Sequence, residues 1–472
     1  MIIFPISNSN SSNSSVDLTS LDLDSALNVN VNNRIALLLG LPRSSRFDSC
    51  AEDSNMSPLV NTLKPATTTT TTLFYHRLRP FLHRWATITS DRWVLEVISS
   101  GLTIPFASIP PTTPPTPSLL RDPSHGAALR EEVLHLLEIG AIERVPDEFR
   151  GKGFYSRYFL VPKKSGGWRP ILDLRGLNRF IRKQRFKMTT LAKIMPALNK
   201  GDWFAVLDLQ DAYFHVTIHI AHRRFLRFVV GDDHFQYRVL PFGLISAPRV
   251  FSKTLAVVAA HLRRIGVVIF PYLDDCLIKA RTQLEAQHMV VATQELFDSL
   301  GLIVNIQKSR PLPTQILNFI GARLDSQLER VHLPLEHFQL IQDLIKTVLQ
   351  APMLPVRVCL QLLGHMASTT IIVRHSRLHL RCLQHWLSTV YKPMEHSIRK
   401  TVVLPVHVKD SLLRWTNHNN MLSGVPFHAP QPSQEITTDA SLIGWGAHMG
   451  TKTVQGRWST TEMMLHINLL EL

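Results

Sequence analysis

Two adjacent carboxylates, Asp274 and Asp275, interrupt an apolar stretch of the chain. Residues 267–270 precede them and residues 277–278 follow, a pattern that predicts a β-hairpin with the acids at its turn. Like charges side by side repel each other, and burial increases that cost, so such a pair is stable where it is exposed or binds a cation. Taken alone, the pair fits an ordinary Asp-Asp turn as well as a metal site.

A third carboxylate, Asp208, ends another apolar run, residues 203–207. If this strand and the hairpin are neighbours in one sheet, Asp208 and Asp274 converge on one edge. Mg²⁺ prefers carboxylate and phosphate oxygens as ligands. Two such ions about 3.5–4 Å apart clamp the attacking and leaving oxygens of a phosphoryl transfer. The chemistry that these residues indicate is therefore metal-assisted phosphoryl transfer.

Several stretches resemble, in order and spacing, the motifs of reverse transcriptases. Residues 206–214 resemble the first aspartate motif, residues 239–248 the motif after it, and residues 272–275 (Tyr-Leu-Asp-Asp) the Tyr-x-Asp-Asp box. Residues 301–309 and 317–321 resemble the two motifs that follow. One box alone is moderately specific, but three in order exclude an ordinary hairpin. The resemblance runs from about Ala127 to Leu472.

The resemblance implies an RNA-directed DNA polymerase that extends a primer by two-metal nucleotidyl transfer. Asp208, Asp274 and Asp275 would hold two Mg²⁺ ions, with Mn²⁺ as an alternative, and Lys308 would steady or protonate the departing pyrophosphate. The residues implied to bind the nucleotide are Lys164, Arg169, Asp211, Ala212, Tyr213, Phe242 and Gly243. Those implied to hold primer and template are Tyr272, Phe319, Ile320 and Gly321. The implied partners are an RNA template, a DNA primer, RNA–DNA hybrid and deoxynucleoside triphosphates.

Two of these roles have a physical basis in the side chains. Lys164 and Arg169 lie on a predicted hairpin over residues 154–174, which in the resembled family forms the fingers; Arg binds phosphate bidentately and Lys acts as a point charge. A solvated basic hairpin is the alternative. The ring of Tyr213 would exclude a 2′-hydroxyl by steric clash, and the alternative is a half-buried aromatic without a selective role.

The elements that position these residues are expected to form an α+β fold, a right-hand polymerase with fingers, palm and thumb. Helices are predicted over residues 127–139, 247–264 and 282–300, and a strand with a basic face over 223–228 that pairs with 235–239. Residues 330–400 are helical in pattern and rich in basic side chains. Arginines interleave with His365, His375, His379 and His385 there, so we interpret these histidines as phosphate-facing rather than metal-binding.

The chain is expected to comprise five regions. Residues 1–72 are Ser/Asn/Thr-rich and predicted to be disordered. Residues 73–126 are predicted to hold a short helical segment that Gly101 ends. An extended, unpacked Pro-rich linker follows it, as either a spacer or a ligand for an SH3-type domain. Fingers and palm are expected over 127–325 and thumb with connection over 326–430.

Residues 431–472 resemble the start of a ribonuclease H domain. Asp439 lies in a predicted strand over residues 435–447, and Glu471 in a predicted helix over 461–472. Only these two of the family's four acids are present, so we expect a truncated domain that cleaves no RNA–DNA hybrid. Residues 153–164 and 363–368 are most similar to DIRS-like retrotransposons.

The overall charge agrees with a polyanionic partner. The chain has 51 Lys and Arg against 36 Asp and Glu, a formal charge of +15, and neutralised phosphates supply most sequence-independent affinity for nucleic acid. The four cysteines are scattered, and neither a signal peptide nor a long apolar run is apparent, which predicts an intracellular protein without a membrane span. The sequence does not indicate an oligomeric state. The alternative function is a degenerate or domesticated copy that only binds nucleic acid.

Overall fold

The structure is a computed structural model that describes residues 73–118, 123–162, 168–429 and 435–470. The predictions for residues 1–72 and for the basic turn at 163–167 lie outside these ranges. The chain divides into two compact units, Met1–Val425 and Pro426–Leu472, and each is treated by itself below. The boundaries expected at residues 72, 126, 325 and 430 stay predictions.

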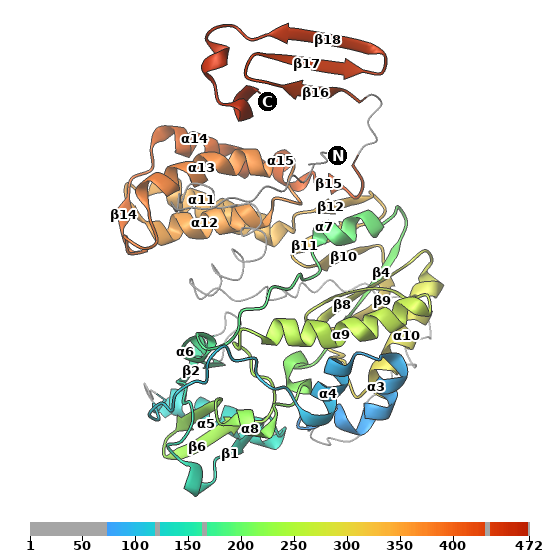
Figure 1. Ribbon diagram of the computed structural model, residues 1–472, viewed down its shortest axis with the longest axis vertical. Coiled ribbons are helices and arrows are strands. Elements are labelled where there is room, and N and C mark those ends of the chain that lie inside the picture. Colours follow the sequence, from blue (N-terminus) through green and yellow to red (C-terminus); the bar gives the residue numbers. More distant parts are fainter. Residues whose placement is uncertain (1–72, 119–122, 163–167, 430–434, 471–472) are drawn as a thin grey trace, which may run out of the picture. The chain divides into compact units, whose positions relative to one another are not determined.

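The centre of the first unit is a four-stranded sheet (Figure 1). Its strands lie in the order β7 (Val268–Tyr272), β8 (Asp275–Ala280), β4 (Trp203–Asp208) and β9 (Arg310–Thr314), and all neighbours are antiparallel. Every residue of β4 after Trp203 is buried, as expected for a central strand covered on both faces. The sheet therefore joins the strand that ends at Asp208 to the Asp274 hairpin, as the sequence predicts.

Two long helices, α9 (Ala247–Arg264) and α10 (Gln283–Ser299), pack against this sheet. α9 has the bounds that its apolar periodicity predicts, and Gly266 follows it with a positive φ of 92°. The hydroxyl of Thr282 caps α10 by accepting a hydrogen bond from the Glu285 N–H. The two helical predictions for this region are confirmed.

A second group of elements corresponds to the predicted fingers. It contains α5 (Pro123–Glu138), the antiparallel hairpin of β2 (Tyr158–Pro162) and β3 (Trp168–Leu172), and a sheet in the order β1 (Ile142–Arg144), β6 (Asp233–Tyr237), β5 (Arg227–Val230). The short helices in this part of the chain are η3 (Asp147–Phe149), α6 (Arg175–Asn178), α7 (Leu191–Ile194), η4 (Met195–Ala197), η5 (Ala212–His215) and α8 (Ile220–Arg223).

The strand predicted over residues 223–228 is wrong at its start and in its exposure. β5 begins only at Arg227, and Arg223 ends α8. Both arginines are buried: Arg223 forms an ion pair with Glu143 at 3.1 Å, and Arg227 donates to the Gln236 side chain at 3.0 Å. The alternating pattern predicts that these arginines form an exposed basic face. In the structure they are instead buried against partners from other parts of the fold.

The segment before the fingers belongs to the polymerase core. η2 (Arg79–Phe81), α3 (Leu82–Ile88) and α4 (Arg92–Ser100) contribute to one hydrophobic core with residues up to Leu302. The indole N–H of Trp85 donates to the Leu300 carbonyl at 3.0 Å. The helical prediction is confirmed, and Gly101 ends α4 as expected.

The Pro-rich segment is extended, but the prediction that it is unpacked is wrong. The Thr113 N–H donates to the Gly153 carbonyl at 2.9 Å, and the Ser118 hydroxyl donates to the Val229 carbonyl at 2.8 Å. The main chain of the fingers offers these acceptors, so the segment is held against the fingers.

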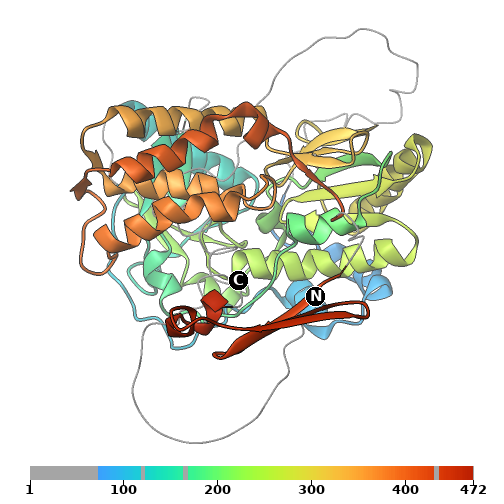
Figure 2. The same ribbon diagram turned by 90° about the horizontal axis from the view of Figure 1, so that it is seen from above.

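The predicted thumb and connection are mainly helical. Figures 1 and 2 show α11 (Leu335–Gln350), α12 (Val356–Ser368), α13 (Ser376–Val390) and α14 (Val406–Leu413) as a bundle of neighbouring helices. The shorter elements of this part are β12 (Arg330–His332), β13 (Leu354–Pro355), β14 (Thr401–Val402), η6 (Arg414–Thr416), α15 (His418–Leu422) and β15 (Val425–Pro426), and β10 (Ile316–Phe319) and β11 (Ala322–Asp325) precede it. No described helix is both long enough and apolar enough to cross a membrane.

The second unit is a three-stranded antiparallel sheet of β16 (Thr437–Ala440), β17 (Gly444–Met449) and β18 (Lys452–Arg457), followed by η7 (Glu462–Met464) and α16 (Ile467–Leu470). The single strand predicted over 435–447 is wrong, because the Ser441 hydroxyl accepts hydrogen bonds from the N–H groups of Ile443 and Gly444 and turns the chain there. The helix predicted over 461–472 is replaced by the two short helical turns in the described part. Glu471 lies outside the described residues.

Candidate active site

The end of β4 brings two predicted site carboxylates face to face. Asp208 is the register partner of Asp275 across the β4–β8 pair. The main chain continues the link, because the Leu209 N–H donates to the Asp274 carbonyl at 2.7 Å. Asp208 is 4% exposed, whereas Asp274 is exposed and Asp275 half-buried. Asp208 is thus buried at the end of the sheet, and accessibility increases from Asp208 through Asp275 to Asp274.

The hairpin turn has an uncommon backbone. Tyr272 pairs with Asp275, so Leu273 and Asp274 alone form the loop, and Leu273 has a positive φ of 54°. A left-handed conformation costs a non-glycine residue roughly 1–2 kcal/mol, and residues held in such conformations cluster at functional sites. This turn places Asp274 at the tip and leaves Asp275 in β8.

The buried thiol of Cys276 lies within electrostatic range of all three carboxylates. Burial raises the pKa of the Cys276 thiol, and the negative charges of Asp275, Asp274 and Asp208 raise it further. Charges of all three residues act on one side chain only if they lie near it. The structure therefore gathers the three carboxylates at one end of the sheet.

Residues 302–309 form a second support for the Asp208 strand end. The Asn305 N–H donates to the Asp208 carbonyl at 2.7 Å, and the Ser309 hydroxyl accepts from the Asp208 N–H at 3.0 Å. The same hydroxyl donates to the Asn305 carbonyl at 2.7 Å. Both main-chain polar groups of Asp208 are thereby bonded to this segment, which fixes the backbone of the carboxylate.

Lys308 lies in the same segment, close to Asp211. Its N–H donates to the Asn305 side-chain oxygen at 3.2 Å, and its side chain is exposed. Desolvation raises the pKa of the Asp211 carboxyl, and the positive charge of Lys308 lowers it again in part. Much of the Asp211 residue is exposed, so we regard the desolvation as a local effect around the carboxyl group.

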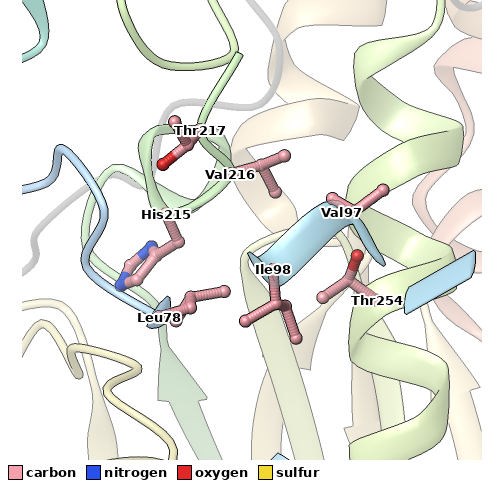
Figure 3. Close-up of a pocket in the computed structure, with 7 residues that line it drawn as sticks. All are labelled: Leu78, Val97, Ile98, His215, Val216, Thr217 and Thr254. Atoms are coloured by element: carbon pink, nitrogen blue, oxygen red, sulfur yellow. The ribbon is translucent and has the colours of Figure 1, made fainter. Parts of the chain in front are cut away.

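His215 connects the segment that follows Asp208 to the segment that contains Lys308. It is 1% exposed; its Nδ1–H donates to the Ala212 carbonyl at 3.1 Å and its Nε2 accepts from the Ile303 N–H at 3.0 Å. Burial lowers the pKa of His215 to about 4, so the imidazole is neutral and holds η5 against the segment with Lys308. Figure 3 shows this histidine beside a cavity of about 10 Å³, between Val97 and Ile98 of α4 and Thr254 of α9. The cavity lies in the core, not at the carboxylates.

The predicted nucleotide-binding aromatic Tyr213 is covered by other rings. Tyr213 lies in η5 and is buried, with its ring centroid 4.8 Å from that of Phe242 and 5.8 Å from that of Phe251. Phe242 itself is 50% exposed. Of these rings Phe242, and not Tyr213, is therefore the one that faces solvent, and Ala212 beside Tyr213 in the chain is buried as well.

Asn178 of α6 holds the turn after Phe242, a role that the sequence did not indicate. Its side-chain N–H donates to the Gly243 carbonyl at 2.9 Å, and its side-chain oxygen accepts from the Ile245 N–H at 2.9 Å. Gly243 has a φ of 95°, a conformation that favours glycine. Since side-chain amide contacts across 65 residues leave no local pattern, Asn178, like His215, could be found only from the fold, which also supplies the partner of the motif residue Ser309.

The remaining predicted residues lie at other places around the sheet. Tyr272 is half-buried in β7, and the β10–β11 turn carries buried Phe319 followed by Ile320 and Gly321, both with positive φ. Arg169 lies in β3 opposite Val161, but its side chain is outside the description, and Lys164 lies outside the described residues.

No three His, Cys, Asp or Glu side chains in the described ranges are arranged as a ready metal cage. The donors are nevertheless of the right kind: three carboxylates near one sheet end, which supply the hard oxygen ligands of Mg²⁺. Their role as metal ligands stays a prediction.

Comparisons with known proteins agree with this arrangement. Residues 161–324 match the family "Reverse transcriptase (RNA-dependent DNA polymerase)". An enzymatic polyprotein of Figwort mosaic virus (strain DxS) is 21% identical over 340 residues, which cover 71% of this chain and 47% of the polyprotein. The chain thus spans about half the length of that relative. We conclude that the chain contains a reverse transcriptase domain.

Solved structures identify the fold. The foamy viral protease–reverse transcriptase in complex with dsDNA has a TM-score of 0.57 at 15% identity, covering 83% of each chain. The same viral protein in complex with RNA/DNA hybrid has a TM-score of 0.55 at 16% identity and covers 82% of this chain and 53% of that one. The polymerase fold expected from the sequence is confirmed.

Proposed function

We propose that the first unit is an RNA-directed DNA polymerase that extends a DNA primer on an RNA template from deoxynucleoside triphosphates. The single observation that carries the proposal is the main-chain bonding at the end of β4, where Asp208 accepts from Asn305 and the next residue, Leu209, donates to Asp274. These contacts join three motif-bearing segments at one sheet end, inside a domain that matches reverse transcriptases. Positioning of this kind is most of what a nucleotidyl transfer requires of its protein.

Asp208, Asp274 and Asp275 would hold the divalent ions, two Mg²⁺ or Mn²⁺. Ions bound there supply the positive charge that activates a primer hydroxyl and neutralises a triphosphate. The backbone of buried Asp208 is held by hydrogen bonds, whereas the more accessible Asp274 and Asp275 would meet the substrates. The exposed ammonium of Lys308 is proposed to attract and position the departing pyrophosphate.

The nucleotide is proposed to lie between the palm and the fingers hairpin. Lys164 and Arg169 would bind its triphosphate, and the sugar would face the neighbouring rings of Phe242 and Tyr213, with Asp211, Ala212 and Gly243 beside them. In this proposal Tyr213 sets how closely the sugar approaches by supporting Phe242. The primer end would lie against Tyr272 and the turn that holds Phe319, Ile320 and Gly321.

The second unit is proposed to lack hybrid cleavage by itself. Asp439 lies exposed in β16 and is the sole acid in the sheet from Thr437 to Arg457. Asp439 and Glu471, two of the four acids that the resembled family uses, would leave most of the charge of two divalent ions uncompensated by protein. An origin in a DIRS-like retrotransposon and an intracellular location remain proposals that rest on the residues quoted above.

Primer extension tests the proposed polymerase. The full chain with Mg²⁺ should extend a DNA primer on an RNA template, and Asp274→Asn should lower the rate by at least about 100-fold while the affinity for the hybrid stays unchanged. Asp232→Asn is the matched control, because Asp232 is an exposed member of another Asp-Asp pair, in the turn before β6. Hybrid binding without extension by the unaltered chain would replace this proposal with the binding-only alternative.

A further inference from the structure

A small cavity lies in the helical bundle at the N-terminal end of α13, remote in sequence from the proposed catalytic residues. Its volume is about 10 Å³, enough for a single oxygen atom or water molecule. One wall comes from the α12–α13 connection and α13, and the other from η6 and α15. The side chains that the cavity offers to a ligand are Arg374, Ser376, His379, Arg414, Trp415 and Asn420.

Two buried donors in the wall lack a partner. The Ser376 hydroxyl and the Trp415 Nε1–H belong to residues that are 2% and 1% exposed, and neither has a hydrogen-bond partner among the residues that the structure describes. A buried polar group left unsatisfied costs about 1–3 kcal/mol. Because an indole N–H can only donate, the group that completes this pocket has to be an acceptor.

The surroundings of the cavity are positively charged. Arg374 and Arg414 are exposed at its rim, and no acidic residue lines it. Partial desolvation lowers the pKa of His379, and the positive charges of Arg414 and His375 lower it further. α13 adds the partial positive charge of its N-terminus, where the side chain of His375 provides no cap. The missing acceptor is therefore expected to carry negative charge.

We propose that this pocket binds a phosphate group. One phosphate oxygen enters the cavity and accepts from the Ser376 hydroxyl and the Trp415 indole. The cavity is too small for a whole phosphate, so the other oxygens stay at the rim, where Arg374 and Arg414 bind them. A water molecule would satisfy the two donors but not the charge of the arginines and the helix end, whereas a phosphate satisfies both.

The phosphate group is either a phosphodiester of a nucleic-acid backbone or a free phosphate, since both offer the same oxygens. The proposal does not rest on polymerase activity, because none of the pocket residues belongs to the proposed catalytic site. A full chain that fails to extend primers can still bind phosphate here. A full chain that extends primers can likewise fail to bind phosphate here.

The indole N–H of Trp415 is a direct probe of the pocket. In the full chain labelled with ¹⁵N-tryptophan, its resonance is identified by its loss in Trp415→Phe. Titration with inorganic phosphate at constant ionic strength should shift this resonance saturably. Ser376→Ala and Arg414→Gln should each weaken the apparent affinity at least about fivefold, whereas Arg399→Gln, which removes an exposed arginine elsewhere in this part, should leave it unchanged.

Two DNA duplexes distinguish the sources of phosphate. A shift of the same resonance by a phosphodiester duplex, but not by one with neutral methylphosphonate linkages, assigns the pocket to a nucleic-acid backbone. A shift by inorganic phosphate alone assigns it to a free phosphate. No shift with any probe, or an undiminished shift in Ser376→Ala with unchanged thermal stability, would overturn the proposal and leave the cavity to water.

Discussion

The three carboxylates at the end of β4 differ in their surroundings, and this difference matters at the scale of single residues. Asp208 is buried with both main-chain groups bonded, while Asp274 lies exposed on a turn whose Leu273 has a left-handed backbone. Like charges held this close repel each other. A divalent cation relieves that repulsion, which is why we favour a metal centre over a structural turn.

Tyr213 offers a test of sugar selection. Tyr213→Val should raise ribonucleotide incorporation relative to deoxynucleotides by at least about tenfold, because the loss of the ring that supports Phe242 opens space for a 2′-hydroxyl. The measurement compares extension rates with the two nucleotide types. Phe251→Leu is the control: Phe251 is a buried residue of α9 whose ring also lies against Tyr213, so its loss loosens the packing but keeps the ring that supports Phe242. Unchanged discrimination in Tyr213→Val would refute the assignment.

His215 predicts a pH dependence of stability. Its pKa is about 4 in the folded chain against an ordinary 6.5, so between these values the unfolded chain binds more protons. Its contribution to stability is full above pH 6.5 and is lost as the pH falls towards 4, by about 2 kcal/mol at pH 5. The measurement is the free energy of unfolding in urea at pH 7.5 and at pH 5. The difference between these two values should be smaller in His215→Gln than in the unaltered chain, by about 2 kcal/mol. Replacement of the exposed His83 by Gln should leave the difference as in the unaltered chain.

At the scale of elements, the segment of residues 302–309 acts as a brace for the β4 end. Ser309→Ala leaves the Asp208 N–H without its acceptor, which should cost about 1–3 kcal/mol of stability and slow primer extension about tenfold. Ser309→Thr keeps the hydroxyl and should restore much of both. Ser299→Ala is the matched control, since that hydroxyl bonds only within its own helix, to the Leu296 carbonyl. Equal effects of the two alanine variants would contradict a specific role for Ser309.

Elements that are fixed by local sequence could be predicted, whereas elements that are held by distant contacts could not. α9 could be predicted to the residue, because its apolar periodicity, the turn before it and Gly266 after it are all local. The start of β5 could not, since Arg223 is held by Glu143 from a distant strand. Likewise the motif carboxylates were accessible from local strand patterns, whereas Asn178, His215 and Ser309 act through contacts across 65 to 101 residues.

At the scale of the whole first unit, the residues before the fingers are part of the polymerase core. Trp85 is fully buried and its indole N–H bonds to Leu300, at the end of α10. Trp85→Ala should therefore lower the free energy of unfolding of the first unit by about 3–5 kcal/mol. Denaturation in urea measures this loss. Trp93→Ala removes a half-buried indole of α4 and should cost less; an equal or larger loss there would show that Trp85 does not anchor the segment.

Cys276, the buried thiol next to Asp275, has a consequence for the chemical durability of the site. Oxidants and alkylating reagents attack the thiolate form, and burial together with three neighbouring negative charges suppresses that form. The thiol therefore reacts only when the β7–β8 hairpin opens. Modification of Cys276 therefore reports that opening. The rate at which a thiol reagent labels Cys276 measures how often the end of the sheet that carries the carboxylates unfolds locally.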